Sequence, residues 1–255
     1  MNPLHRRLIA FFLLSYVLTW WGFALVRVAP SQTWAGTNFA LGPLIAAPIV
    51  IWFTEGREGL VRWLKRLVNF RAPVWVYTAA FFVPLGISAL CTIFAIASGS
   101  ATVPAPVNGF DALAMFVPIV LLTGPFPEEV TFRGFGQHEL QEEISPFAAS
   151  LLIGVGVVIW HLPLFLSGED PWLIAVAIMA VSVVYAWLYV CGGSVWPVVI
   201  VHFVVNYFGA GFFRELLAPE GSYGYAVFLT IFYLAWAALI VWRLGPSLGR
   251  QPKSA

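Results

Sequence analysis

Long apolar runs separated by short polar stretches make up most of the chain. An α-helix needs about 20 predominantly apolar residues to cross the hydrocarbon core of a bilayer. The pattern therefore predicts an all-α fold, a polytopic membrane bundle of about eight transmembrane helices. The expected spans are Leu8–Val28, Asn38–Phe53, Val74–Ala97, Ala112–Phe135, Phe147–Leu166, Pro171–Val190, Val195–Phe213 and Tyr223–Trp242.

The composition is that of a membrane protein. Hydrophobic residues make up 60% of the chain and charged residues only 10%, and the mean hydropathy is +0.87. No connection has the composition of a separate soluble domain, so we expect residues 1–255 to form a single membrane domain. A net charge of +1, without a basic cluster and interleaved aromatic residues, does not indicate a nucleic-acid partner. Cys91 and Cys191 lie far apart in apolar stretches and are expected to be packing residues.

The basic residues predict the orientation of the bundle. With the amino terminus in the cytoplasm, the opposite face receives only Arg27 and Arg214. The cytoplasmic face receives ten basic residues: Arg6, Arg7, Arg57, Arg62, Lys65, Arg66, Arg71, Arg243, Arg250 and Lys253. This positive-inside pattern predicts that both termini are cytoplasmic. The basic segment Gly56–Arg71 has apolar residues at helical spacing and is expected to be an interfacial helix on the anionic leaflet of the bilayer.

The fourth expected span contains a group of charges. Glu128, Glu129 and Arg133 follow two prolines, Pro125 and Pro127. A charge in the middle of a bilayer costs about 2.5–3.5 kcal/mol on insertion scales, so these groups should pair or face a water-filled cavity. A helix beginning near Pro127 would pair Glu129 with Arg133 four residues later and would leave Glu128 free for other work.

Two histidines and an asparagine interrupt two further spans. His161 lies in the fifth span, and His202 and Asn206 share one helix face in the seventh. Counting about 1.5 Å of rise per residue brings His202 and Glu128 to similar depths in the cytoplasmic half of the membrane, with His161 somewhat deeper. We therefore expect the side chains of these three spans to meet.

Such a group of side chains suits two chemistries. A glutamate can act as general base on water while imidazole and carboxamide groups stabilise an oxyanion, which together would hydrolyse an amide. Glu128, His161 and His202 would equally form a zinc site with an open fourth position, as in a metalloprotease. The residues do not choose between the two. The sequence from His138 to Glu142 lacks the second histidine of a zinc-protease helix.

The three motifs together resemble those of the CPBP intramembrane protease family, which comprises the type II CAAX prenyl endopeptidases and the bacteriocin-processing or immunity-associated Abi group. The motifs are Glu128-Glu129 with Arg133, then His161, then His202 with Asn206. The resemblance implies that Glu128 activates water with help from His161. It implies that His202 and Asn206 stabilise the oxyanion, and that Glu129 and Arg133 support the site. Val157 departs from the phenylalanine usual four residues before the histidine, which bears on substrate fit more than on chemistry.

The resemblance implies an intramembrane endopeptidase with its catalytic core at about residues 112–213, cutting a peptide bond near the cytoplasmic membrane face. Its substrate would be a peptide or protein, either prenylated or a peptide precursor, and its location the plasma membrane of a prokaryote. Two other functions stay open on the residues alone. Glu and His could relay protons in a proton-coupled carrier, or the chain could be a non-catalytic bacteriocin-immunity scaffold.

Overall fold

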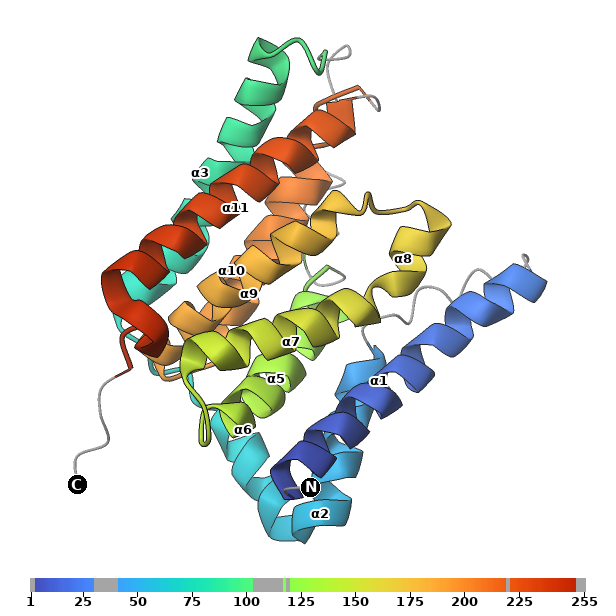
Figure 1. Ribbon diagram of the computed structural model, residues 1–255, viewed down its shortest axis with the longest axis vertical. Helices are drawn as coiled ribbons and strands as arrows, with labels where there is room; N and C mark the ends of the chain where they lie inside the picture. Colours follow the sequence, from blue (N-terminus) through green and yellow to red (C-terminus); the bar gives the residue numbers. More distant parts are fainter. Residues whose placement is uncertain (1–2, 30–40, 103–116, 118–119, 219–220, 251–255) are drawn as a thin grey trace.

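A computed structural model describes residues 3–29, 41–102, 117, 120–218 and 221–250. Within these ranges the regular structure is helical and no strand is found, which confirms the all-α prediction (Figure 1). Five of the described helices are long and apolar enough to cross a membrane: Leu4–Val28, Val74–Ala97, Leu173–Gly192, Trp196–Phe213 and Ser222–Ser247. The expected count of about eight spans stays a prediction.

The first three helices are α1 (Pro3–Val28), α2 (Leu41–Leu67) and α3 (Val74–Ala97). Helix α3 has the predicted bounds. The range of α2 contains two helices that meet at a kink at Gly56, which agrees with the predicted division between the second span and the basic segment beginning at Gly56. Gly56 has φ 66° and ψ −161°, a backbone conformation that a residue with a side chain rarely adopts. The predicted start of the second span, residues 38–40, lies outside the described residues.

The charged part of the fourth span forms α5 (Pro125–Thr131), a π-helical turn η2 (Phe132–Gln137) and the short α6 (His138–Leu140). Helix α5 begins within two residues of the predicted start, with prolines in its first turn, where the missing amide hydrogen removes no helical hydrogen bond. Most of the predicted first half of this span lies outside the described residues.

The fifth span is not one helix, which corrects the prediction of a continuous Phe147–Leu166. It divides into α7 (Pro146–Trp160) and α8 (Leu162–Ser167), with His161 at the junction. Pro163 cannot donate a backbone hydrogen bond and its ring crowds the preceding turn, so the helix breaks just before it. His161 therefore sits at a helix end instead of along a helix face.

The remaining helices are α9 (Leu173–Gly192), α10 (Trp196–Val204), the π-helical η3 (Val205–Phe213), α11 (Ser222–Leu244) and the 3₁₀ turn η5 (Gly245–Ser247). One buried core lies among α3, α9, α10 and α11, around Tyr233 and Val184. A second core joins α1, α2, η2 and α7 around Trp160 and Phe132. Figure 1 shows α5 between these two groups of helices, which places its charged residues in the interior of the bundle.

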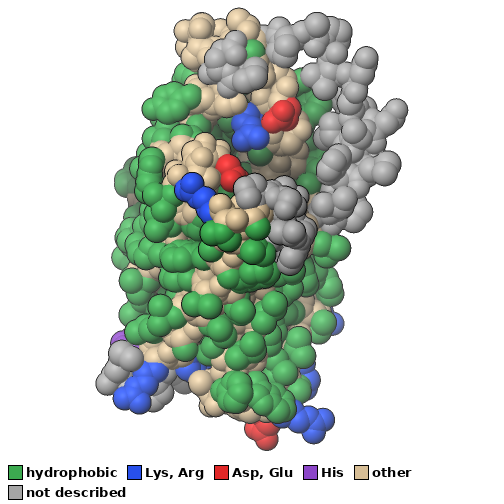
Figure 2. Space-filling view, turned by 90° about the vertical axis from the view of Figure 1, so that its right-hand side faces the viewer, with side chains coloured by type: hydrophobic (Ala, Val, Ile, Leu, Met, Phe, Trp, Pro, Cys, Tyr) green, Lys and Arg blue, Asp and Glu red, His purple; other side chains and the backbone are tan. Residues whose placement is uncertain are grey.

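Charged side chains gather at one end of the bundle, which we call the basic end (Figure 2, lower edge). The start of α1 and the end of α11 both lie there, as an even number of crossings requires (Figure 1). Arg7 joins α1 to Glu55 of α2 and Glu139 of α6, and Arg62 donates to Glu55 over 2.8 Å. Burial raises the pKa of Glu139, and the Arg7 guanidinium beside it opposes that shift.

Candidate active site

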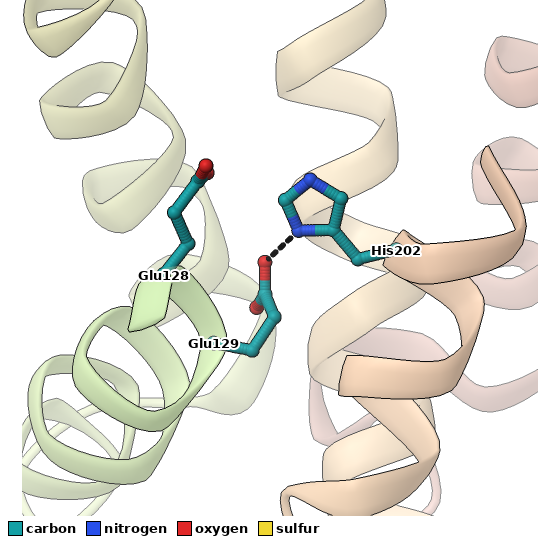
Figure 3. A group of neighbouring side chains, drawn as sticks. All are labelled: Glu128, Glu129 and His202. Carbon is teal, nitrogen blue, oxygen red and sulfur yellow. Dashed lines mark hydrogen bonds and ion pairs between the residues drawn. The ribbon is translucent and has the colours of Figure 1, made fainter. Parts of the chain in front are cut away.

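The two adjacent glutamates leave the first turns of α5 toward α10 (Figure 3). Their side chains are buried, with Glu128 7% and Glu129 1% exposed. A buried carboxylate needs hydrogen bonds, an ion pair or water to replace its hydration. Their burial together, with His202 facing Glu129 from the neighbouring helix, makes this a polar cluster in the bundle interior.

Glu129 is held by contacts from two other residues. His202 Nδ1 lies 2.7 Å from Glu129 Oε1, a hydrogen bond between α10 and α5 (Figure 3). Arg133 Nε lies 3.3 Å from Glu129 Oε2, which makes the predicted ion pair, although the angle is not that of an aligned hydrogen bond. Both oxygens of Glu129 are thus engaged, and this residue links α5, η2 and α10.

Helix α9 adds two residues that sequence reasoning missed. Ser182 Oγ accepts a hydrogen bond from Arg133 Nη2 over 3.2 Å. The Tyr185 ring lies 5.1 Å from the Arg133 guanidinium carbon and 5.8 Å from the His202 ring centre. The sequence did contain a signal for these two residues. Each carries a hydroxyl within a mostly apolar span, and a spacing of three residues places them on one helix face. Ser182 and Tyr185 thus contact Arg133, which in turn pairs with Glu129.

Glu128 differs from its neighbour. Among the described residues, no hydrogen bond or salt bridge to its carboxylate is found. A β-carbon added to Gly124 would lie 3.3 Å from Asn206 Nδ2 and 3.5 Å from Glu128 Oε1. The carboxylate of α5 and the carboxamide of η3 therefore approach the same point. The bare backbone of Gly124 leaves room for both.

His161 approaches from the junction of α7 and α8. Its Nδ1 lies 2.9 Å from the carbonyl oxygen of Val157. A carbonyl can only accept, so Nδ1 carries a proton and Nε2 is the acceptor of the neutral ring. Val157, where the family pattern has phenylalanine, thus contributes its backbone to the orientation of the histidine and its side chain to the cavity wall.

These side chains line a common cavity of about 1010 Å³. All six predicted site residues line it: Glu128, Glu129, Arg133, His161, His202 and Asn206. His202 lies about 9 Å from the start of α10, which begins at the basic end. From the polar cluster the cavity extends toward the end of the bundle opposite the basic end. The residues that line it there include Glu169, Asp170, Trp172, Arg214 and Tyr223. Burial raises the pKa of Asp170 at this rim, and the nearby Arg214 opposes that shift.

The same cluster contains donor atoms that zinc could use. Among the described residues, ligand atoms of Glu128, Glu129 and His202 lie within 4.8 Å of one another. Zinc binds such atoms at about 2.0–2.2 Å. Glu129 is hydrogen-bonded to His202 Nδ1 and also pairs with Arg133, so it could bind an ion only by losing these contacts. Glu128 and His202 Nε2 could bind one without such a change, so this set fits zinc only in part. The tripod of Glu128, His161 and His202 stays a prediction.

Gly124→Ala is expected to slow catalysis by about tenfold or more, because a misplacement of about 1 Å can cost two orders of magnitude. The added methyl would crowd Asn206 Nδ2 at 3.3 Å and would be in van der Waals contact with Glu128 Oε1 at 3.5 Å. Gly86→Ala is the matched control, since nothing lies within 4 Å of its added β-carbon. Cleavage rates and unfolding temperatures of both variants test this. Equal activity of the two would show that Gly124 does not set the spacing.

Fold and site together define a helical membrane protein with a buried acid–imidazole cluster that faces an internal cavity. Residues 110–208 match the family model described as type II CAAX prenyl endopeptidase, Rce1-like. The chain is also similar to a protein named CAAX prenyl protease 2 from Methanococcus maripaludis, with 24% identity over 222 residues, covering 77% of this chain and 81% of the relative. These two similarities agree with the resemblance to the CPBP proteases that the three motifs indicate.

Proposed function

We propose that this chain hydrolyses a peptide bond inside the membrane, with Glu128 as the general base that activates water. One observation carries the proposal. Glu128 is buried beside a cavity of about 1010 Å³ that His161, His202 and Asn206 also line, whereas Glu129 is occupied by His202 and Arg133. A buried carboxylate that faces a cavity and is not held by an ion pair suits proton transfer.

The proposed step begins with a water between Glu128 and His161. Glu128 takes a proton from this water while the water oxygen forms a bond to the carbon of the peptide carbonyl. His161 Nε2, the acceptor of a ring whose Nδ1 is tied to Val157, orients the second water proton. The protonated Glu128 then passes its proton to the amide nitrogen as the carbon–nitrogen bond breaks.

The negative charge that develops on the carbonyl oxygen needs donors. Asn206 Nδ2 and Glu128 Oε1 would each lie within 3.5 Å of a β-carbon added to Gly124, so the amide is placed to reach an oxygen attached to the attacked carbon. Glu129 holds His202 by Nδ1, which leaves Nε2 as the ring atom that donates to the oxyanion when the ring is protonated. Donors oriented in advance in this way commonly contribute about 10²–10³-fold to the rate of acyl transfer.

The apolar side chains of the cavity wall favour binding of an apolar substrate. One side of α9 contributes Ile174, Ala177, Ile178 and Val181 along the way from the distant rim to the cluster. A lipid-modified or strongly apolar peptide would bury its chain against this wall. We propose that the scissile bond lies in the half of the membrane next to the basic end, which is cytoplasmic if the positive-inside pattern holds.

The test is peptide cleavage by the purified protein in detergent and in liposomes. A farnesylated CAAX-type peptide, its unprenylated counterpart and a mixed peptide library are incubated with the protein, and the products are identified by mass spectrometry. We expect cleavage of at least one class, and it should persist with a zinc chelator. If chelation abolishes activity and zinc restores it, the reaction depends on a metal ion and the metal-free glutamate mechanism is wrong. Solute or proton flux without any cleavage would overturn the protease proposal in favour of a carrier.

A further inference from the structure

A second pocket, separate from the catalytic cavity, lies at the basic end. Its volume is about 240 Å³. The polar residues that line it come from four parts of the chain and include Arg66, Asn69, His138, Gln141, Ser194 and Arg250. No acidic residue is among the described residues that line it. The pocket therefore concentrates positive charge and hydrogen-bond donors.

Two of its donors are buried and lack a partner. Arg66 Nε and Gln141 Nε2 are inaccessible to solvent and make no hydrogen bond to any described residue. Leaving a buried donor unsatisfied is costly, and more so for a charged group, so such atoms point to a missing acceptor. Both residues line the same pocket, so rotation of their side chains would let each donor reach an acceptor bound there.

The other polar groups of the pocket are already engaged and set its shape. Ser194 Oγ donates to the Asn69 carbonyl over 2.6 Å, and Asn69 Nδ2 donates to the Gly193 carbonyl over 3.2 Å. His138 Nδ1 lies 3.0 Å from the Tyr189 hydroxyl. These bonds connect the end of α2 with the α9–α10 turn. The pocket is thus a built feature between packed elements and is not a gap between surface side chains.

The second guanidinium belongs to Arg250. It donates to the Gln141 carbonyl and lies 3.6 Å from Glu142 Oε1, with its side chain 30% exposed. Two acidic residues therefore lie near the pocket without lining it, Glu142 beside Arg250 and Glu139 within electrostatic reach of Arg66. Among the described residues that line the pocket, the permanently charged ones are therefore Arg66 and Arg250, and both are positive.

We propose that this pocket binds a phosphate group, carried either by an anionic lipid headgroup or by a free phosphate compound. Guanidinium groups match the geometry of phosphate oxygens and form charge-assisted hydrogen bonds with them. A tetrahedral phosphate has enough oxygens to accept hydrogen bonds from Arg66, Gln141 and Arg250, which all line the pocket. The pocket adjoins the basic second half of α2, where a membrane surface with anionic lipids would lie. This binding is independent of the proposed peptidase activity.

Binding by the full-length protein in neutral detergent tests the proposal. Inorganic phosphate is titrated at constant ionic strength, and mixed micelles with phosphatidylglycerol are compared with micelles of phosphatidylcholine. Native mass spectrometry counts bound phosphate or lipid, and unfolding temperature reports stabilisation. Arg66→Gln and Arg250→Gln should each weaken binding by about tenfold or more, given the strength of charge-assisted hydrogen bonds. Lys65→Gln, the same charge change one residue away and outside the pocket, should change it less than about twofold.

The outcomes separate the sources and can overturn the proposal. Saturable binding of phosphatidylglycerol alone identifies a lipid headgroup, and binding of inorganic phosphate as well identifies a general phosphate site. If Arg66→Gln and Lys65→Gln weaken binding equally, the attraction is the diffuse charge of the surface and the proposal is wrong. It is equally wrong if neither probe binds to the wild-type protein. Because Arg250 lies at the rim, its variant remains informative if Arg66→Gln does not fold.

Discussion

Glu128→Gln is expected to lower the rate of peptide cleavage by about 10²–10⁴-fold, the usual contribution of a general base. Glutamine has nearly the same shape as glutamate, so the packing around this buried side chain is retained. Its amide cannot take a proton from water, so the nucleophile is no longer activated. Single-turnover cleavage measured beside the wild type gives the effect on the chemical step.

The control for Glu128→Gln is the same change at an exposed carboxylate. Glu58 on α2 has a side chain that is 91% exposed, and Glu58→Gln should retain wild-type activity. Both variants should unfold at the wild-type temperature in detergent. A Glu128→Gln protein that cleaves within about tenfold of the wild type would show that another group activates the water.

Arg133→Met is expected to have the largest effect on stability, a loss of about 3–5 kcal/mol, because it removes the guanidinium from a buried ion pair and leaves Glu129 with only its hydrogen bond to His202. Arg133 and Glu129 have side chains 3% and 1% exposed, so water cannot replace the lost ion pair. Methionine fills much of the same volume, which limits the contribution of a cavity. Unfolding in mixed detergent and denaturant, followed by tryptophan fluorescence, measures the loss.

Two further variants separate the buried charge from packing. Arg62→Met breaks an ion pair with Glu55 whose arginine side chain is 55% exposed, and should lose no more than about 1 kcal/mol. Adding Glu129→Gln to Arg133→Met should recover part of the loss, because a neutral amide is cheaper to bury than an unpaired carboxylate. If the double variant is less stable than Arg133→Met alone, the contacts of Arg133 with Ser182 and Tyr185 carry the effect instead.

Local features of this protein were predictable because neighbouring residues alone decide them. The bounds Val74–Ala97 of α3 follow from an uninterrupted apolar run. The Glu129–Arg133 ion pair follows from a spacing of four residues on a helix, and the start of α5 from its prolines. The prediction of one unbroken helix through His161 was wrong because it gave too little weight to Pro163, which also acts locally.

The sequence by itself determined that the protein is helical, that it belongs in a membrane, and which polar residues are expensive to bury and therefore candidates for a site. Only the tertiary structure decided that Glu129 and not Glu128 bonds to His202, that α9 contributes Ser182 and Tyr185, and that Arg66 and Arg250 line one pocket. Each of these contacts joins residues from different helices. The rotation and packing of helices decide such contacts, and the spacing of residues along one chain segment does not encode them.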